Sequence, residues 1–236
     1  MQRIGIIVNP HAKFVRKSRI DIPALYGLIG GEFADVRTPS SFGELDEAIT
    51  SFRESSVDCI GVSGGDGTLH QALTRAIRLY APDSPPPILI LKSGTMDNVA
   101  RTIALKGKGP DILKRMIAAF KQGKTPAAHR RDTIKVGERY GFLFGAGLTS
   151  NFLEAAYEGD RKGFLKNAEV IARAVAGGVA GSRKGLLKRL NAKGIADGRA
   201  LPFNDVLGML AGTVEHVGMG FSPMPRAVEK DGTFQL

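Results

Sequence analysis

The sequence predicts an α/β fold, in which a parallel sheet covered by helices precedes a smaller, β-rich part. Short apolar runs alternate with amphipathic stretches through residue 122, and this strand-then-helix order is typical of a parallel sheet with helices on its faces. After residue 128 the pattern changes to paired short strands with Gly and Pro breaks. The chain has 236 residues, of which 43% are hydrophobic and 24% charged, so it can bury a sizeable core.

Four strands are expected in the first part, each a short run of mainly apolar residues. They cover residues 3–8, 32–37, 58–62 and 88–91. Amphipathic helices are expected at 42–52, 68–80 and 112–120, and a further helix opens after residue 93. In the first of these helices, the apolar residues Phe42, Leu45, Ile49 and Phe52 have a helical spacing that places them on one face.

A domain boundary is predicted near residues 126–130, where the segment 123–126 (GKTP) forms a linker-like break. It divides the chain into an α/β domain, 1–128, and a β-rich, sandwich-like domain, 129–236. The second domain is expected to contain strands at 130–136 and 140–144 joined by a hairpin turn at 137–139, helices at 149–157 and 164–175, and a basic stretch at 183–193. We expect this domain to be incomplete at its C-terminal end.

Positive charge is concentrated in the middle of the chain. The formal net charge is +10, and residues 101–194 carry 20 basic against 7 acidic side chains. This excess favours an anionic partner, which could be nucleotide phosphate, an anionic membrane surface or nucleic acid. The alternative is a solvated basic face without a partner. The absence of Trp argues against a base-stacking platform, so nucleic acid is not expected. The helix at 164–175 either lies in a membrane interface or packs on the second domain's sheet.

Cysteine usage and the N-terminal segment predict a cytoplasmic protein. The single cysteine, Cys59, excludes a disulfide framework and a cysteine-based zinc site. It lies in an apolar run, which predicts a buried and inert thiol. The N-terminal apolar run ends directly in Asn-Pro, which favours a first strand over a signal peptide. No stretch is apolar enough to predict a membrane span, and the oligomeric state is left open.

The segment 63–70 (SGGDGTLH) lies between a predicted strand and a predicted helix. Glycines have no Cβ, so their backbone can approach a phosphate, and free N–H groups at a helix start attract negative charge. Asp66 would repel a polyphosphate unless a cation bridged the two, so it implies Mg²⁺. A tight turn capped by Asp66 or Thr68 is the structural alternative.

A second Gly-Thr turn, formed by Gly94 and Thr95, follows the next predicted strand. Two adjacent strands that end in this way form one crevice at the carboxyl edge of a parallel sheet, where open α/β folds bind ligands. Asn9 closes the first strand and Thr38 the second, so we expect both at the same edge. Hydroxyl, amide and glycine groups at four strand ends suit a nucleotide.

In their order along the chain, these motifs resemble the diacylglycerol kinase catalytic domain family, which includes bacterial lipid kinases and the sphingosine and ceramide kinases. The resemblance implies a nucleotide-binding α/β domain followed by a β-sandwich-like domain. It also implies transfer of the γ-phosphoryl group of ATP to the hydroxyl of a diacylglycerol-like or sphingoid lipid. The residues that it assigns to ATP are Asn9, Thr38, Gly64, Gly65, Asp66, Gly67, Thr68, Leu69, His70, Gly94 and Thr95, and Asp66 is the candidate catalytic residue.

The second part of the chain also resembles this family. The segment 140–148 (YGFLFGAGL) is similar to a family strand that leads to a Gly-x-Gly turn, and 225–232 (PRAVEKDG) to a loop that can hold a structural Mg²⁺. The resemblance implies that the carboxylate of Asp231 and the backbone carbonyls of Val228 and Thr233 are its ligands. An Asp-Gly hairpin turn without an ion is the alternative.

Three departures from the family pattern concern the site. The usual Gly-Asn-Asp after Gly-Thr is replaced by Met96, Asp97 and Asn98, so the polar pair is reversed. Lys13 stands where a Gly often follows Asn-Pro-x-Ala/Ser. The family's Asp-Gly-Glu segment, whose Glu is thought to deprotonate the lipid hydroxyl, would lie beyond the last residue. We expect either a chain that ends within its second domain or a protein that lacks this base.

The expected function is that of an ATP- and Mg²⁺-dependent lipid kinase that docks peripherally on an anionic membrane surface. Phosphoryl transfer requires positioning and neutralisation of phosphate charge more than covalent chemistry. Another kinase of the same fold, such as an NAD kinase or a phosphofructokinase, is one alternative. A non-catalytic nucleotide- or lipid-binding regulator is the other.

Overall fold

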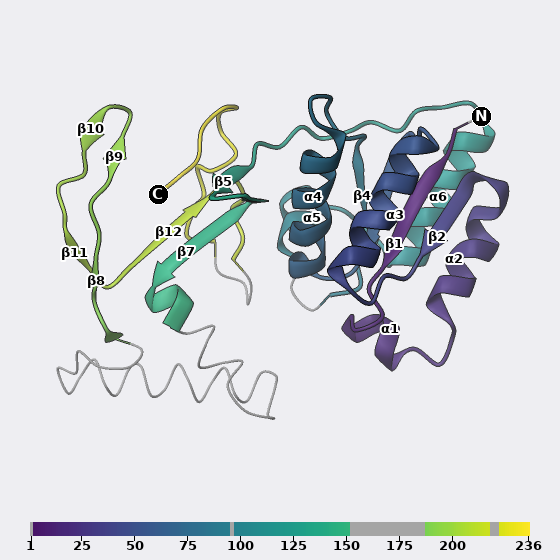
Figure 1. Cartoon of the computed structure of the whole chain (residues 1–236), viewed down its shortest axis with the longest axis horizontal. Coiled ribbons are helices and arrows are strands. Elements are labelled where there is room, and N and C mark those ends of the chain that lie inside the picture. The colour runs from purple at the N-terminus through teal and green to yellow at the C-terminus, as the bar shows by residue number, and fades with distance from the viewer. Residues whose placement is uncertain (1, 95–96, 152–186, 218–221) are drawn as a thin grey trace. The chain divides into compact units, whose positions relative to one another are not determined.

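The computed structural model describes residues 2–94, 97–151, 187–217 and 222–236. It divides into two compact units, of which the first comprises residues 1–142 and 213–233 and the second residues 143–212 and 234–236 (Figure 1). This division places residues 129–142 with the first unit. The domain boundary near residues 126–130 stays a prediction.

The first unit is built on a four-stranded parallel sheet with the strand order β2-β1-β3-β4. The strands are β1 (Ile4–Val8), β2 (Ala34–Arg37), β3 (Cys59–Ser63) and β4 (Ile88–Ile90). Strand β1 lies between β2 and β3, so that Ile4 is paired with both Ala34 and Cys59. Because parallel strands run in one direction, the loops that follow β1, β3 and β4 all leave from the same edge of the sheet.

Helices connect the strands, as parallel pairing requires. They are α1 (Lys13–Lys17), α2 (Ile22–Gly30), α3 (Phe42–Glu54), α4 (Asp66–Tyr80), α5 (Asn98–Thr102) and α6 (Gly109–Lys121), with a 3₁₀ turn, η1 (Gly31–Phe33), before β2. Helices α2 and α6 pack together, and α3 packs against α4 (Figure 1). The sheet therefore lies between helices, as the alternating sequence pattern predicts.

The core of the first unit surrounds the two central strands. Every residue of β1 and β3 is buried, which explains why both are continuous apolar runs and not alternating ones. Helix α3 packs so closely on β1 that a Cβ on Gly5 would lie 2.5 Å from the ring of Phe52. On the opposite side of the sheet, Tyr26 of α2 and Leu113 of α6 are fully buried in the same cluster as Ile4 and Ile6.

Short antiparallel strands follow the parallel sheet. Strands β5 (Ile134–Val136) and β6 (Arg139–Gly141) form a hairpin whose turn includes Gly137 at a φ of +57°. In the second unit, antiparallel pairs are formed by β7 (Leu143–Gly147) with β12 (Gly208–Gly212), β8 (Leu190–Asn191) with β11 (Asp205–Val206), and β9 (Ile195–Ala196) with β10 (Arg199–Ala200). This order, a parallel sheet with helices followed by smaller antiparallel strands, confirms the predicted fold class.

Most differences from the expected elements concern their ends. The strand expected at 32–37 begins at Ala34, because residues 31–33 form a 3₁₀ turn. The strand expected at 130–136 begins only at Ile134, and the one expected at 140–144 is split between β6 and β7. Residues 148–151 are helical, in agreement with a helix near 149. The rest of that helix, the helix at 164–175 and most of 183–193 lie outside the described residues.

The sequence pattern does not predict α2. Eight of its nine residues, IPALYGLIG, are apolar or glycine, and the ninth is Tyr26, so no polar face marks a helical period. Its start carries a local signal nevertheless: the carboxylate of Asp21 accepts a hydrogen bond from the backbone N–H of Ala24 at 3.0 Å, and a proline occupies the first turn.

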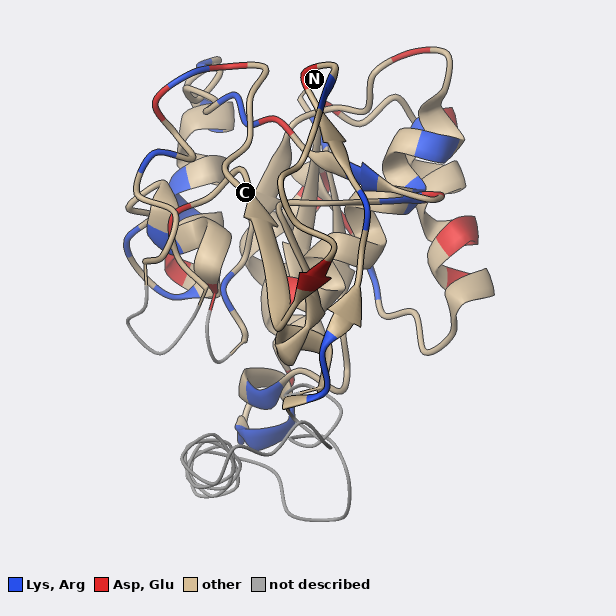
Figure 2. Cartoon of the chain, turned by 90° about the vertical axis from the view of Figure 1, so that its left-hand side faces the viewer, with Lys and Arg blue, Asp and Glu red and all other residues tan. Residues whose placement is uncertain are grey.

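Basic and acidic side chains are intermixed in the described parts of the chain. Figure 2 shows basic and acidic residues on the same helices. Six of the 20 basic residues in 101–194 fall outside the described ranges, namely Arg161, Lys162, Lys166, Arg173, Arg183 and Lys184. In the described parts of the chain, no helix has the length and apolar character needed to cross a bilayer.

Candidate nucleotide site

Two glycine-containing loops meet at the carboxyl edge of the sheet. The loop after β3 contains Gly64 and Gly65, and the loop after β4 contains Ser93 and Gly94. The backbone N–H of Ser93 donates to the carbonyl of Gly64 at 3.2 Å. A Cβ on Gly94 would lie 2.5 Å from the Cα of Gly65, so the two backbones approach more closely than side chains would allow. The structure thus brings together the two motifs that the sequence analysis predicted to form one crevice.

Asn9 joins the end of β1 to the Gly-rich loop, the segment 63–70 that runs from the end of β3 into the start of α4. Its Nδ2 donates to Oγ1 of Thr68 at 2.7 Å, and its Oδ1 accepts from the backbone N–H of His11 at 2.8 Å. A Cβ on Gly64 would collide with the side chain of Thr68. Asn9 and Thr68 therefore stabilise the start of α4, and both lie at the predicted edge.

Asp66 connects the two loops directly. Its Oδ1 accepts from the backbone N–H of Asn98 at 2.9 Å, at the start of α5, and the N–H of Val99 also hydrogen-bonds to this carboxylate. Burial raises the pKa of Asp66 above its ordinary value, and repulsion from Asp97 adds to the rise, whereas the backbone bonds and Arg101 act in the opposite direction. Asp66 thus caps α5, a contact with a partner 32 residues away that the sequence analysis did not foresee.

A second half-buried carboxylate, Asp97, lies at the same place. Burial raises its pKa, while a hydrogen bond from the backbone of Gly94 and the charges of Lys92 and Arg101 lower it. Asp97 has a φ of +47°, a left-handed conformation that Asp tolerates better than most residues. Two carboxylates that repel each other at a glycine-lined edge are a suitable place for a cation.

A cavity of about 320 Å³ opens beside the Gly-rich loop. It is lined by Ile7, Asn9, His11, Pro39, Ser40, Ser41, Phe42, Leu45, Gly67, Thr68 and Gln71. The lining residues come from β1 and the loop after it, from the loop after β2, and from the N-terminal halves of α3 and α4. The cavity is therefore at the carboxyl edge, where a parallel sheet binds ligands. A larger cavity, of about 770 Å³, lies along the β9–β10 hairpin of the second unit and contains none of the predicted site residues.

Several predicted site residues have other positions or roles. Thr38 is exposed, and its neighbours Pro39 and Ser40 line the cavity instead. Leu69 is 6% exposed and belongs to the core. His70 packs against Gly141 of β6, and its pKa is lowered by burial and by the charge of Arg139. Thr95 lies outside the described residues.

Buried hydroxyl groups form a hydrogen-bonded network beside the two loops. The hydroxyls of Tyr26 and Ser63 are 3.3 Å apart, those of Ser63 and Ser93 are 2.8 Å apart, and Ser93 also donates to the carbonyl of Leu91 at 3.0 Å. All three residues are at most 2% exposed. The sequence analysis missed this network, because its members are 30 or more residues apart along the chain.

Replacing Tyr26 with phenylalanine is expected to lower the free energy of unfolding by about 0.5–1.5 kcal/mol, since it removes one hydroxyl from this network. Tyr80→Phe is the matched control. The hydroxyl of Tyr80 is buried without a hydrogen-bond partner among the described residues, so its removal should be neutral or stabilising. Urea unfolding of both variants measures the difference, and equal effects would contradict a role for the network.

The predicted Mg²⁺ loop near the C-terminus forms a tight turn. Gly232 has a φ of +74°, and its N–H donates to Oδ2 of Asp132 at 2.6 Å. The side chain of Thr233 donates to the carbonyl of Lys230 at 2.8 Å, and Asp231 is exposed. In the described parts of the chain, no group of three or more His, Cys, Asp or Glu is placed to hold a metal ion. Ligation by Asp231, Val228 and Thr233 stays a prediction.

Cys59 is a core residue, as predicted. It is 3% exposed in the central strand β3, and burial raises the pKa of its thiol to about 12. The thiol is therefore protonated at neutral pH and unreactive.

Comparisons with known proteins agree with this arrangement. The family model described as diacylglycerol kinase catalytic domain matches residues 3–128. None of the curated proteins matches the chain. Three solved structures from Bacillus anthracis str. Sterne are similar, one described as a diacylglycerol kinase and two given that assignment provisionally.

The three structures share the fold of the chain at low sequence identity. Their TM-scores are 0.62, 0.64 and 0.68, with identities of 18%, 16% and 19%. The matches cover 95%, 99% and 99% of this chain, and 69%, 71% and 74% of the other chains.

Proposed function

The chain belongs to the diacylglycerol kinase catalytic domain family, and we propose that it is a lipid kinase that transfers the γ-phosphoryl group of ATP to a lipid hydroxyl. The observation that carries the proposal is the contact between Gly65 and Gly94. Two loops without side chains at their contact let a phosphate approach the backbone closely, and the first N–H groups of α4, which have no side-chain cap, are available to its oxygens.

In this proposal the phosphates lie on the start of α4. That helix has 15 residues and begins at Asp66 without a side-chain cap at Gly65, so its first N–H groups are available to an anion. Asn9 and Thr68 position the loop, and the cavity beside it is open to the rest of the nucleotide. Such positioning is the main requirement of phosphoryl transfer.

The proposal includes Mg²⁺ held by Asp66, with Asp97 as a second carboxylate. Burial raises the pKa of Asp66, and repulsion from Asp97 adds to the rise, so a bound cation would relieve the cost of holding this carboxylate in its charged form. Mg²⁺ binds through one or two carboxylates together with substrate phosphates, so two carboxylates are sufficient. When bound, the ion would neutralise charge on the transferred phosphoryl group.

The basic excess of residues 101–194 leads us to propose that the lipid is reached at an anionic membrane surface. Each basic group near such a surface contributes about 1 kcal/mol, and salt screens the attraction. The substrate class is a diacylglycerol-like or sphingoid lipid.

The test is to incubate the purified protein with labelled ATP, Mg²⁺ and vesicles that contain diacylglycerol or sphingosine, in parallel with NAD and sugar phosphates. We expect label in a lipid, none without Mg²⁺, and faster labelling on anionic than on neutral vesicles, with the difference lost at high salt. Equal rates on both vesicle types would contradict electrostatic docking.

Other outcomes separate the alternatives. Label in NAD or in a sugar phosphate would identify another kinase of this fold. Binding of ATP without transfer to any acceptor would favour a non-catalytic regulator. Failure to bind ATP would overturn the assignment of the nucleotide site itself.

A further inference from the structure

Phe42 does not join the core, although its spacing groups it with core residues. Leu45, Ile49 and Phe52 of the same helix are at most 6% exposed, whereas Phe42 is 61% exposed. It lies at the first position of α3 and lines the 320 Å³ cavity beside the Gly-rich loop. Exposure of a large aromatic side chain costs hydrophobic free energy, so its position in the wall of a cavity requires an explanation.

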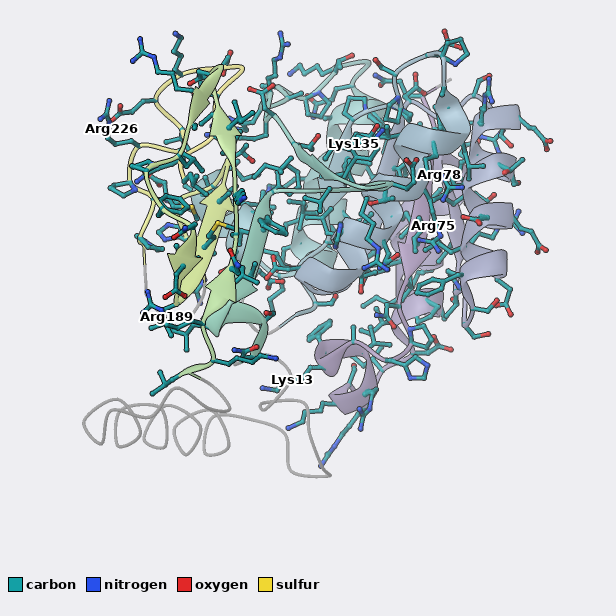
Figure 3. All side chains as sticks on the ribbon, turned by 60° about the vertical axis from the view of Figure 1, so that its left-hand side comes forward. Lys13, Arg75, Arg78, Lys135, Arg189 and Arg226 are labelled. Atoms are coloured by element: carbon teal, nitrogen blue, oxygen red, sulfur yellow. The ribbon has the colours of Figure 1, made fainter. Side chains whose placement is uncertain are left out.

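The ring is held in place from one side by Arg75 of α4, whose position is labelled in Figure 3. The guanidinium carbon lies 4.3 Å from the centroid of the Phe42 ring, a distance typical of cation–π contacts. Arg75 is fixed in turn: its Nε forms an ion pair with Oδ1 of Asp46 at 2.9 Å, and one terminal nitrogen donates to Oε1 of Gln71 at 2.6 Å. Its side chain is only 13% exposed, so Arg75 covers one face of the Phe42 ring from a largely buried position.

The backbone around Phe42 is fixed as well. Oγ of Ser41 accepts from the backbone N–H of Glu44 at 3.2 Å, and the carboxylate of Glu44 accepts from the N–H of Ser40 at 2.8 Å. These reciprocal bonds form a capped helix start. A planar ligand that stacked on Phe42 would therefore meet a preorganised surface and lose little free energy in ordering it.

Gln71 supplies a polar group in the same cavity. Its Oε1 accepts from Arg75, which orients the amide and leaves Nε2 as a hydrogen-bond donor. The cavity also includes Gly67 and Thr68 of the Gly-rich loop. An aromatic ring, an oriented amide donor and an adjacent phosphate loop are the groups that recognise a base joined to phosphates.

We propose that Phe42 stacks on the purine base of the nucleotide, with Arg75 as the residue that positions its ring and Gln71 as a donor to the base. This inference rests on the proposed function, and it specifies how the nucleotide's base is bound. Stacking of a base on an aromatic ring is lost when the ring is truncated, with a decrease in affinity of roughly tenfold to a hundredfold.

The test compares the affinities of ATP and of inorganic tripolyphosphate, which has no base, by calorimetry. Phe42→Ala is expected to weaken ATP binding by roughly tenfold to a hundredfold and to leave tripolyphosphate binding unchanged. Phe42→Trp, which keeps an aromatic ring at this position, should bind ATP with an affinity close to that of wild type. Phe234→Ala, which truncates another exposed phenylalanine, 55% exposed and located in the second unit, is the matched control and should bind both ligands as wild type does.

A double-mutant cycle tests the role of Arg75. Arg75→Met should weaken ATP binding less than Phe42→Ala does, and it should add little in the double variant, because both changes act through the same ring. Equal losses for ATP and tripolyphosphate in Phe42→Ala would assign Phe42 to the folding of the loop and overturn the inference. Unchanged ATP binding in Phe42→Ala would overturn it while the proposed function stands, whereas a wild-type protein that binds neither ligand would overturn both.

Discussion

Replacing Gly94 with alanine is expected to abolish measurable ATP binding and to lower the free energy of unfolding by about 1–3 kcal/mol. The added Cβ would lie 2.5 Å from the Cα of Gly65 and 2.8 Å from a carboxylate oxygen of Asp97. The neighbour at 2.5 Å is backbone and cannot rotate away, so the two loops would have to separate. Separation would also disturb the Gly94–Asp97 hydrogen bond and the start of α4, where the phosphates are proposed to bind.

Gly67→Ala is the matched control for stability. Gly67 is the second residue of α4, directly after the loop that contains Gly64 and Gly65, and a Cβ at this position would have no neighbouring atom within 4 Å. Because Gly67 is in the first turn of α4, alanine should leave stability unchanged or raise it by up to about 1 kcal/mol. Guanidinium unfolding and calorimetric titration with ATP measure both quantities. Wild-type ATP affinity in Gly94→Ala would show that the contact between the loops is not the phosphate site.

The sequence predicted the sheet, and the meeting of its two glycine-containing loops at one edge, because these depend on local patterns. Central strands buried on both faces are continuous apolar runs. The glycine turns after β3 and β4, two neighbouring parallel strands, lie at one edge by the geometry of parallel sheets alone. This reasoning placed Asn9, Gly64 and Gly94 correctly. It failed for α2, whose apolar composition shows no helical period.

The remaining parts of the site depend on contacts that no local pattern encodes. Phe42 has the spacing of a core residue, but at the first position of its helix it is stacked under Arg75, 33 positions along the chain. Asp66 resembles a lone carboxylate among glycines, yet it accepts hydrogen bonds from α5. A pattern identifies which residues can share a face, and tertiary packing decides which partner each one meets.

Asp66 is therefore expected to have two separable roles, a structural one and an electrostatic one. Asn at this position keeps an oxygen that can accept from the backbone N–H of Asn98, but it has no charge. Alanine removes both. Asp66→Ala should be less stable than Asp66→Asn by about 0.5–2 kcal/mol, the usual loss when a side-chain cap is removed.

The charge of Asp66 should decrease the stability of the fold at neutral pH. Burial raises its pKa above the ordinary value of 3.8, so the folded state holds the proton more tightly than the unfolded state does. The stabilising effect of that proton is fully present below pH 3.8 and is lost as the pH rises through the folded pKa. We therefore expect Asp66→Asn to be more stable than wild type at pH 7, and the difference to vanish as the pH is lowered below 4.

The same substitution should abolish phosphoryl transfer. In the proposed function this charge binds Mg²⁺, and the bound ion would offset the cost of the charge to stability. The test measures unfolding across pH 3–8 and Mg²⁺-dependent ATP turnover on Asp66→Asn and wild type. Together these measurements separate the effect of the charge on stability from its effect on activity. A variant that is more stable at pH 7 and inactive would separate the charge from the cap. Wild-type turnover in Asp66→Asn would show that the carboxylate acts only as a cap for α5, and the cation would then have to be assigned elsewhere.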